Sequence, residues 1–562
     1  MIQRILIAIE FLASVSFCNA QQSPQLRYFS PPAEVEKAIA TCDIAVYGGT
    51  SAGSIAAIQA ARMGHKVTLL SFNGYVGGLT SGGLTATDLG KKSTIGGLAR
   101  EFYQRVGGLR DFRSTSAEKL YHDMMKDAGV KVILHQPLES VRMDGSRMVS
   151  VTMMTGLTVN AQMFIDATYE GDLMAAAKVS YQVGREPRSA FDESLAGQWQ
   201  EISWQGVYQF CDLPISPYKT PGKPESGLLP GISPHPHGAP GDGDYRVQAY
   251  NFRMILSDKA DRIPFPRPVG YDPSRYALLA RFLNFDAAVV WTLNYTTKAM
   301  TDGPVQMRNG DSNNAGSFSS DLIDGSHAWP DGTFQPINFA KSLSPRRGLP
   351  APLPQLYQKR EVIFQDHVTY QQGLMFFLAK DAQVPADLRE RAGRFGLDPN
   401  EFKTTGHWPH QLYVREGRRM VSDYIMTQAD CEGRKVAQDS VGLASYPMDS
   451  HFCQRVAVER NGVMTVRNEG GFGHSCKGPY PVSFRSITPK PSECTNLLVP
   501  VSLSASHVAF GSIRMEPVFM ILGQSAGTAA SLAIRQQLPI QQIPYSTLRE
   551  RLLADGQILT NQ

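Results

Sequence analysis

Two histidines of this chain stand in polar contexts that suit proton transfer. His451 ends the block YPMDSH, just after Asp449, and His507 ends the block SASH, shortly before Arg514. Histidine changes charge near neutral pH, and nearby carboxylates or guanidinium groups adjust that change. His451 and His507 are therefore candidate general bases for taking a proton from a substrate hydroxyl. A purely structural role is the alternative for each of them.

Other polar residues are weaker candidates. His407 and His410 flank a Trp-Pro pair, and a cluster of arginines follows in YVREGRR. Arg415, Arg418 and Arg419 could bind a carboxylate, but their helix-like spacing predicts that at least one of them is a structural salt-bridge partner.

A dense polar loop, RNGDSNNAGSFSSD, spans residues 308–321. Its Asn313, Asn314 and Asp321 offer both hydrogen-bond donors and acceptors, which suits binding of hydroxyl groups. We therefore count Asn313 and Asn314 among the candidate catalytic-site residues. A solvated surface loop remains the alternative.

An element able to position such residues lies near the N-terminus, in DIAVYGGTSAGSIAAIQAARMGHKVTLLS, residues 43–71. Residues 43–47 predict a buried strand, residues 52–63 a helix and residues 66–70 a second strand, so the unit predicts a parallel sheet. Glycines at 48, 49 and 53 permit a tight turn, close approach to a pyrophosphate and close packing of helix on strand. The helix N-terminus would face the phosphates.

The match to a dinucleotide-binding pattern is incomplete. Thr50 stands where the spacing calls for a glycine, and Ser71 replaces the acidic residue expected after the second strand. A glycine-rich turn without a cofactor is the alternative interpretation. The candidate cofactor-binding residues of this unit are Gly48, Gly49, Thr50, Ser51, Ala52 and Gly53.

The next segment, NGYVGGLTSGGLTATDLG, has five glycines between Gly74 and Gly83, a backbone suited to close approach of a flat ring. Here the chain resembles the secreted bacterial FAD-dependent oxidoreductases of the glutathione-reductase-like fold, which carry Y-G-G-T-x-A-G and then G-G-L-T-S-G-G-L. That family itself uses the Thr50 form, whereas Ser71 leaves the group that holds the adenosine ribose undetermined. The resemblance implies further FAD-binding residues: Gly77, Gly78, Ser81, Gly82, Gly83, Arg100 and Ala167.

The resemblance extends to a C-terminal run, residues 496–534, in which an apolar strand is followed by serines, His507 and a helix expected from Pro517. In the resembled fold the N-terminus of this helix faces the flavin pyrimidine, where its dipole stabilises negative charge. A small-residue helix packed on another helix is the alternative. The run adds the candidate cofactor-binding residues Arg514, Gly523, Gln524 and Ala526.

The remaining elements fit the same α/β class. Residues 130–134 and 163–168 predict strands, and residues 141–154 a hairpin that turns at Asp144 and Gly145. The resemblance implies a glutathione-reductase-like, Rossmann-type FAD-binding domain with an inserted α+β substrate or cap domain. We expect its two FAD-binding parts at 40–185 and 431–545, and the inserted domain at 186–430, which is rich in Pro and irregular loops.

Length and charge limit the possible partners. The 562 residues suffice for several modules, and the net charge of +4, without long basic runs, gives no indication of nucleic-acid binding. Beyond the N-terminal segment, no stretch reads as a membrane span.

Residues 1–20 read as a signal peptide, with Arg4 before an apolar run and a small-residue cleavage site at Cys18–Ala20. The mature chain would then start at Gln21 in the periplasm or outside the cell. Without a twin arginine, export would precede folding, and FAD would be acquired outside the cytoplasm.

Six cysteines follow the expected cleavage site, and in an oxidising compartment disulfides can form. His451 with Cys453 and His474 with Cys476 repeat a His-x-Cys spacing, but this spacing is too narrow for known zinc patterns, so we expect no metal. A Cys453–Cys476 disulfide is the preferred interpretation.

These features predict an exported FAD-dependent dehydrogenase or oxidase that exchanges a hydride between flavin N5 and a small polar substrate, with a sugar or glycoside as the leading class. Oxidation coupled to elimination, which would cleave a glycosidic bond, is one alternative. A non-catalytic secreted carbohydrate-binding protein is another. The absence of a second dinucleotide motif leaves oxygen, a quinone or a protein carrier as the electron acceptor, without deciding between them.

Overall fold

The computed structural model describes residues 26–110, 112–198, 214–234, 238–285, 320–323, 326–328, 334–336 and 353–561. The expected signal peptide at 1–20, and the candidates Asn313 and Asn314, lie outside these described residues.

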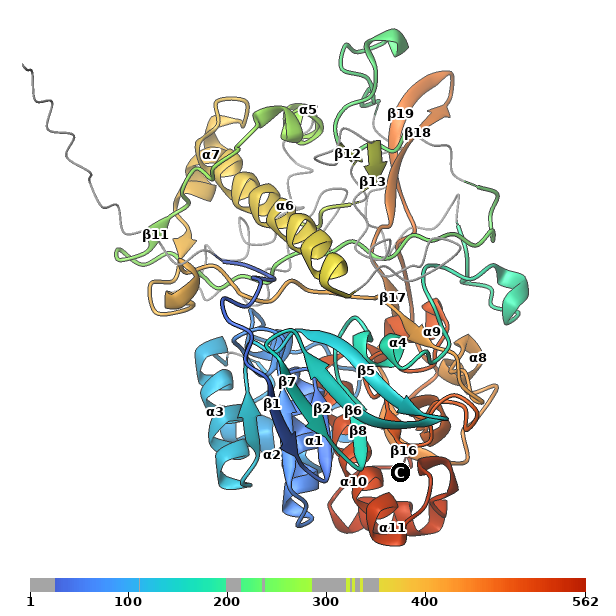
Figure 1. Cartoon of the computed structure of the whole chain (residues 1–562). Helices are drawn as coiled ribbons and strands as arrows, with labels where there is room; N and C mark the ends of the chain where they lie inside the picture. Colours follow the sequence, from blue (N-terminus) through green and yellow to red (C-terminus); the bar gives the residue numbers. More distant parts are fainter. Residues whose placement is uncertain are drawn as a thin grey trace, which may run out of the picture.

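A parallel sheet forms the centre of the lower half of the molecule (Figure 1). Ile44 lies opposite Val67 on one side and Met163 on the other. The strand-helix-strand unit predicted for residues 43–70 is therefore confirmed as β2, α1 and β3. The strand order is β22 (Leu497–Leu498), β8 (Met163–Asp166), β2 (Ile44–Tyr47), β3 (Val67–Leu70) and β4 (Lys131–Ile133).

Two buried helices, α1 (Ser51–Arg62) and α10 (Glu516–Gln536), pack closely against each other beside this sheet. A Cβ atom on Gly523 would lie 2.3 Å from the Ala52 carbonyl oxygen, and one on Gly527 would lie 2.5 Å from that of Ala56. Side chains at these positions would hold the helices apart, so the small residues of α10 serve helix packing.

A second sheet covers the first in the view of Figure 1. Its strands β5 (Leu138–Asp144), β6 (Arg147–Met153) and β7 (Leu157–Asn160) form an antiparallel meander, as expected from the predicted hairpin. Sequence reasoning missed β1 (Ala38–Thr41), which adds to β7 in parallel at the edge.

The other helices of this half lie around the two sheets (Figure 1). Pro517 stands in the first turn of α10, as predicted for its start, and Ser506 caps the N-terminus of the helix just before it. The helices that surround the two sheets are α2 (Gly97–Val106), α3 (Ser114–Asp127), α4 (Asp172–Ala176), α8 (Gln428–Cys431), α9 (His507–Ile513) and α11 (Tyr545–Ala554).

The upper half of Figure 1 is built mainly from the middle of the chain. It holds α5 (Ala277–Phe285), the long α6 (Leu353–Lys380) and α7 (Ala386–Gly393). A small antiparallel sheet joins β10 (Leu256–Ser257), β14 (Gly396–Leu397) and β11 (Ile263–Pro264).

Short antiparallel pairs complete the described chain. The long hairpin of β18 (Gln454–Arg460) and β19 (Val463–Glu469) reaches into the upper half, although the sequence assigned it to the second FAD-binding part (Figure 1). The other pairs are β16 (Ser440–Ala444) with β21 (Tyr480–Ser483), β17 (Met448–Ser450) with β20 (Phe472–His474), β9 (Tyr181–Gln182) with β15 (Arg419–Met420), and β12 (Ser326–Ala328) with β13 (Phe334–Pro336).

One buried carboxylate, Asp172, connects the two halves. Arg360 of α6 donates two hydrogen bonds to it, at 2.7 and 2.8 Å, and Arg418 donates a third at 2.8 Å. Burial raises the pKa of Asp172, but the two guanidinium groups outweigh burial and lower it to about 2. Asp172 is therefore a permanent anion that joins α4, α6 and the segment before β15.

The helix α10 has the length and mean hydropathy, 1.4, of a membrane span, contrary to the expectation that no segment beyond the N-terminal one does. However, 94% of its apolar window is buried inside the protein, as in the core helix of a globular domain. It is the one helix among the described residues that meets these criteria.

The predicted Cys453–Cys476 disulfide is wrong. Both cysteines are free, because Cys453 faces the backbone of His451 whereas Cys476 contacts Tyr446 and Ser512. Among the described residues, no group of three or more His, Cys, Asp or Glu side chains is arranged to hold a metal ion.

Replacing Asp172 by Asn should lower the free energy of unfolding by about 3–5 kcal/mol, because it leaves Arg360 and Arg418 buried without a counter-charge. Chemical denaturation checks this value. The matched control is Asp123→Asn, at an exposed carboxylate paired with Lys119, which should leave stability nearly unchanged because solvent screens the pair. Equal small effects of both variants would contradict the role of Asp172.

Candidate functional site

The turn between β2 and α1 requires glycine at two positions. Gly48 has a φ of +112°, and a Cβ atom there would lie 2.6 Å from the carbonyl carbon of Ala167. A Cβ atom on Gly53 would lie 2.0 Å from the Gly48 carbonyl oxygen. The two glycines therefore let the turn pass directly beside the end of β8, and the start of α1 opens toward the same edge of the sheet.

Thr50 has a structural role that explains why it replaces glycine. It is the N-cap of α1, and its Oγ1 accepts a hydrogen bond from the amide of Gly53 at 3.2 Å. The same hydroxyl donates to the carbonyl of Ala167 at 2.7 Å. Thr50 thus joins the turn to β8, while Ala167 contributes its backbone.

A hollow lies beside this turn, at the carboxyl ends of the parallel strands. Four segments that are distant in sequence line it: Gly48–Thr50, residues 71–78, residues 168–170 and Gln411. Its neighbour, a cavity of about 480 Å³, shares Phe72, Asn73 and Tyr75 and extends to residues 27–34 and 135–137. The two hollows share these three lining residues, and we refer to them together as the groove. It lies beside the N-terminus of α1, where backbone N–H groups favour an anion.

Ser71 packs against the turn, and its side chain brings no charge to the groove. Its hydroxyl lies 3.0 Å from Oδ1 of Asn73 and 3.1 Å from the carbonyl oxygen of Tyr75, to either of which it can donate. A Cβ atom on Gly49 would lie 2.7 Å from the Ser71 hydroxyl oxygen, so the contact is tight. Asn73 is the polar side chain next to Ser71 that reaches both parts of the groove.

The second glycine-rich segment folds as a compact turn against aromatic rings. Gly77 and Gly78 have positive φ values, and Cβ atoms there would lie 2.4 Å from the Tyr121 ring and 2.3 Å from the Tyr169 hydroxyl. Only Gly78 of this segment's candidates lines the hollow. Cβ atoms on Gly82 and Gly83 would meet Gln411 and Arg253, and Ser81 bonds to the carbonyls of Val76 and Gly78.

The structure does not bring Arg100 to the groove. The buried face of α2 carries Leu98 and Phe102, which turns Arg100 outward, where its Nε donates to the Ile95 carbonyl at 3.0 Å.

Three α10 candidates also serve packing. Gln524 accepts a hydrogen bond from the Leu98 amide at 2.8 Å, and Gly523 lies against α1. Ala526 is fully buried in the same helix. Ser51 and Ala52, in the first turn of α1, are likewise fully buried.

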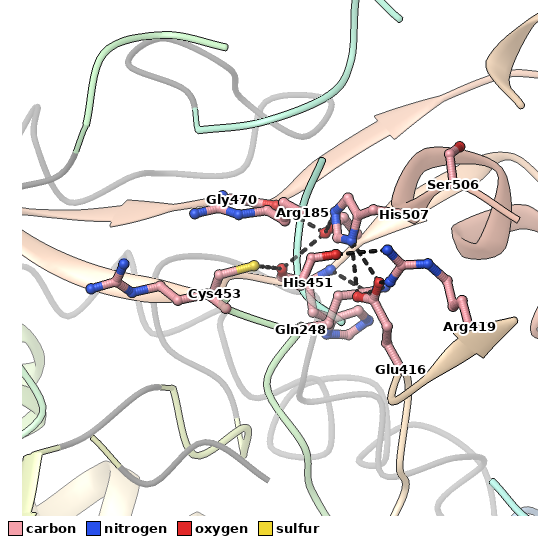
Figure 2. A network of polar contacts seen from close by, with 12 residues as sticks. Arg185, Gln248, Glu416, Arg419, His451, Cys453, Gly470, Ser506 and His507 are labelled. Atoms are coloured by element: carbon pink, nitrogen blue, oxygen red, sulfur yellow. Dashed lines mark hydrogen bonds and ion pairs between the residues drawn. The ribbon is translucent and has the colours of Figure 1, made fainter. Parts of the chain in front are cut away.

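His507, the first residue of α9, lies in a buried polar network (Figure 2). Its Nδ1 is 2.9 Å from both carboxylate oxygens of Glu416, and its Nε2 is 3.4 Å from the Ser450 hydroxyl. Arg419 bridges Glu416 and Glu186. Burial raises the pKa of Glu416, but His507 and Arg419 outweigh burial and leave it lowered, so Glu416 is an anion facing the ring.

His451 lies beside His507 and has its own carboxylate. Its Nδ1 is 2.7 Å from Oδ2 of Asp321, which also pairs with Arg415 at 3.0 Å. Burial, together with Arg415, lowers the pKa of His451 and keeps its ring neutral near pH 7. The polar loop that ends at Asp321 thus reaches the candidate histidine.

Arg514 completes the cluster of His451, His507 and Arg514, which we call the histidine cluster. Its guanidinium donates to Asp449 at 2.6 Å and to the Tyr413 hydroxyl at 2.8 Å. Asp449 and Ser450 belong to the same strand, β17, which joins the surroundings of the two histidines. The three candidates are brought together from two blocks of sequence, all of them buried, and none lines the groove described above.

The arginine cluster is not helical, contrary to the expected spacing. Apart from an isolated bridge at Leu412, residues 411–418 form no regular secondary structure, and they lead into β15. Arg415, Arg418 and Arg419 all form buried ion pairs, with Asp321, Asp172 and two glutamates respectively.

His410 stacks on Tyr75 at 3.7 Å between ring centroids, and burial lowers the pKa of His410 to about 3. Its neutral ring therefore supports Tyr75, which lines the groove. His407 donates one hydrogen bond from Nδ1 to the carbonyl oxygen of Glu401 at 3.0 Å, away from the histidine cluster.

Sequence reasoning missed the acidic partners Glu186, Glu193 and Glu416. Glu416 stands in the arginine-rich block itself, and a buried ion-pair partner there was the available signal. Glu186 and Glu193 carried no comparable signal, because they meet α9 only in the folded chain: Glu186 accepts the His507 amide, and Glu193 accepts the Ser506 hydroxyl.

A glycine turn at the start of a parallel βαβ unit, with a groove at the strand ends, defines a dinucleotide-binding protein. A model of the family described as FAD dependent oxidoreductase matches residues 43–552, and the chain belongs to this family. The protein is accordingly an FAD-dependent oxidoreductase. The glycine turn, the N-terminus of α1 and the groove fit FAD.

Matches to solved structures are partial, and the chain spans less than two thirds of each one named here. OxyS anhydrotetracycline hydroxylase from Streptomyces rimosus is 12% identical, over 26% of this chain and 36% of its own, with a TM-score of 0.22. NikD, an unusual amino acid oxidase, is 16% identical over 26% of this chain and 57% of its own, with a TM-score of 0.19. T. acidophilum thioredoxin reductase is 19% identical over 27% of this chain and 40% of its own, with a TM-score of 0.18. No curated protein matches the chain.

Glu193 makes stability near the histidine cluster depend on pH. Its Oε1 accepts hydrogen bonds from the Gln428 amide and the Ser506 hydroxyl, and burial raises its pKa to about 7. A raised pKa favours the protonated form in the folded state, so this contribution is full below about pH 4.5 and is lost as pH rises through 7.

The variant Glu193→Gln keeps the accepting oxygen and cannot ionise. From pH 5 to pH 8 the unmodified protein should lose on the order of 2–3 kcal/mol more stability than this variant. Thermal or chemical denaturation at both pH values checks the difference. An identical pH dependence of both proteins would contradict the raised pKa.

Proposed function

We propose that this protein is an exported FAD enzyme of the glutathione-reductase-like type, which oxidises a small polar substrate, a sugar or glycoside, by hydride transfer to flavin N5. The observation that carries the proposal is the convergence of His451 and His507, each paired with a carboxylate, in a protein of an FAD-dependent family. Residues 186–430 would act as the inserted substrate or cap domain.

The groove residues would hold FAD by its phosphates and its adenosine. Backbone N–H groups of residues 49–51, at the start of α1, suit the pyrophosphate. Asn73 and Gln136, which line the larger cavity, offer hydrogen bonds to the ribose in place of the acidic residue that Ser71 lacks. When bound, FAD accepts a hydride from a carbinol carbon.

His507 is the proposed proton acceptor for the substrate hydroxyl. Because Nδ1 faces both oxygens of Glu416, its proton stays on Nδ1 and the lone pair lies on Nε2. Glu416 also stabilises the cationic ring that forms when Nε2 takes a proton. It acts as the group that orients the base. Arg419 and Glu186 hold Glu416 and the backbone of His507 in place.

His451 is the second candidate base, and its neighbours indicate the substrate class. Asp321, which orients its Nδ1, ends the polar loop that contains Asn313 and Asn314. Amide and carboxylate groups recognise hydroxyls, so we propose that this loop supplies sugar-binding contacts close to His451. Oxidation followed by elimination would use the same residues, and cleavage of a glycoside would distinguish it from simple oxidation.

Export is proposed from the N-terminal segment alone. A charged residue, an apolar run and small residues before Gln21 are typical of a cleaved signal peptide. The intact mass of protein recovered from the periplasm or the medium tests this proposal. A chain that still starts at Met1, or one confined to the cytoplasm, would contradict it.

The purified protein should show flavin absorption bands after reconstitution with FAD, and anaerobic addition of sugars should bleach them. The first measurement is the visible spectrum, repeated on the supernatant after acid precipitation to separate free from covalent flavin. Bleaching by one sugar class, with a keto product, supports the proposal. Flavin binding without bleaching by any member of a sugar and glycoside panel would contradict the substrate class.

Replacing His507 by Gln should slow flavin reduction by about 100- to 10,000-fold, because glutamine can still face Glu416 but cannot accept the proton. His451→Gln is measured in parallel, and His474→Gln, at an exposed position, is the matched control. Stopped-flow bleaching gives the rates, and flavin content confirms folding. Unchanged rates in both buried variants would remove these histidines from catalysis.

A further inference from the structure

Two cysteines far apart in sequence lie side by side in the fold. Cys431 is the last residue of α8, and Cys476 lies in the loop between β20 and β21. The amide of Lys477 donates to the carbonyl of Cys431 at 3.3 Å, which holds the two backbones together. Their thiol groups interact directly through a side-chain hydrogen bond.

We propose that Cys431 and Cys476 are a thiol pair that forms a disulfide when a small disulfide oxidant is present. This pairing replaces the one expected from sequence spacing, because Cys453 lies elsewhere, next to Arg185 and the backbone of His451. The proposal does not rest on the proposed function.

The environments of the two thiols assign their roles in the reaction. Cys476 is partly exposed, and its hydrogen bond with Cys431 lowers its pKa, which favours the reactive thiolate. Cys431 is fully buried, and burial raises its pKa well above the ordinary value. Cys476 is therefore the attacking residue and Cys431 the resolving one.

The exchange balances with oxidised glutathione as the oxidant. The Cys476 thiolate attacks one sulfur of glutathione disulfide, forming a mixed disulfide and releasing one glutathione thiolate. Cys431 loses its proton and attacks the Cys476 sulfur, which releases the second glutathione. The protein loses two electrons and two protons, and glutathione disulfide becomes two thiols.

The bond would fasten the surroundings of His507. Cys476 lies 3.6 Å from the hydroxyl of Ser512 in α9, and Tyr480 donates to the same hydroxyl at 2.6 Å. At the other end of α8, Gln428 shares Glu193 with Ser506, the N-cap of α9. Joining α8 to the loop before β21 therefore braces α9, the helix that begins at His507.

The test treats the purified full-length protein with oxidised glutathione, alkylates remaining thiols under denaturing conditions and maps the peptides. We expect a cross-linked pair containing Cys431 and Cys476, together with a Tm about 2–4 °C higher than that of the reduced protein, since the bond closes a loop of about 45 residues. Dithiothreitol should reverse both changes.

Variants separate this pair from the other thiols. Cys476→Ser and Cys431→Ser should each abolish the cross-linked peptide and the Tm increase, whereas Cys42→Ser and Cys494→Ser, at buried cysteines elsewhere in the fold, should retain both. If a variant fails to fold, the peptide map of the unmodified protein decides. A Cys453–Cys476 link, or both thiols still alkylated after oxidation, would overturn the proposal.

Discussion

The buried carboxylate of Asp172 is the interaction on which the arrangement of the two halves depends. It follows β8 of the parallel sheet, yet its partners, Arg360 and Arg418, come from α6 and from the segment before β15. Two guanidinium groups without this anion would be buried charges with no compensation, a cost of several kcal/mol. Arg415 and Glu416, in the segment before β15, and Arg419, in β15 itself, surround the histidine cluster. The position of the candidate bases therefore depends on the ion pairs of Asp172.

Local features of the fold were predictable from the sequence because they depend on neighbouring residues. The alternation of apolar strand, glycine turn and small-residue helix at 43–70 fixes β2, α1 and β3, and the turn residues Asp144 and Gly145 fix a hairpin. The role of Thr50 was not predictable, since its hydrogen bond to Ala167 crosses to another strand. For the same reason β1, whose partner β7 lies far along the chain, was missed.

The candidate site was predictable in part. His451 and His507 were identified from their local context as candidate bases, and Arg514 was predicted from the family resemblance as a cofactor contact. The fold brings the three together through β17 and α9. Their carboxylate partners come from distant segments, so only the tertiary structure shows that Glu416 faces His507 and that Asp321 faces His451. Gly523 was predicted as a flavin contact, and its distance to the Ala52 carbonyl oxygen shows that it also serves the packing of α10 on α1.

The groove also constrains the order of events during synthesis of the protein. Its walls come from residues near 48, 71–78 and 168–170 and, much later in the chain, from Gln411. The helix α10, which packs against α1, is synthesised later still. A ribosome-bound fragment therefore lacks a complete groove until almost the whole chain has emerged, so a flavin that binds there would be captured in one of the last steps of maturation.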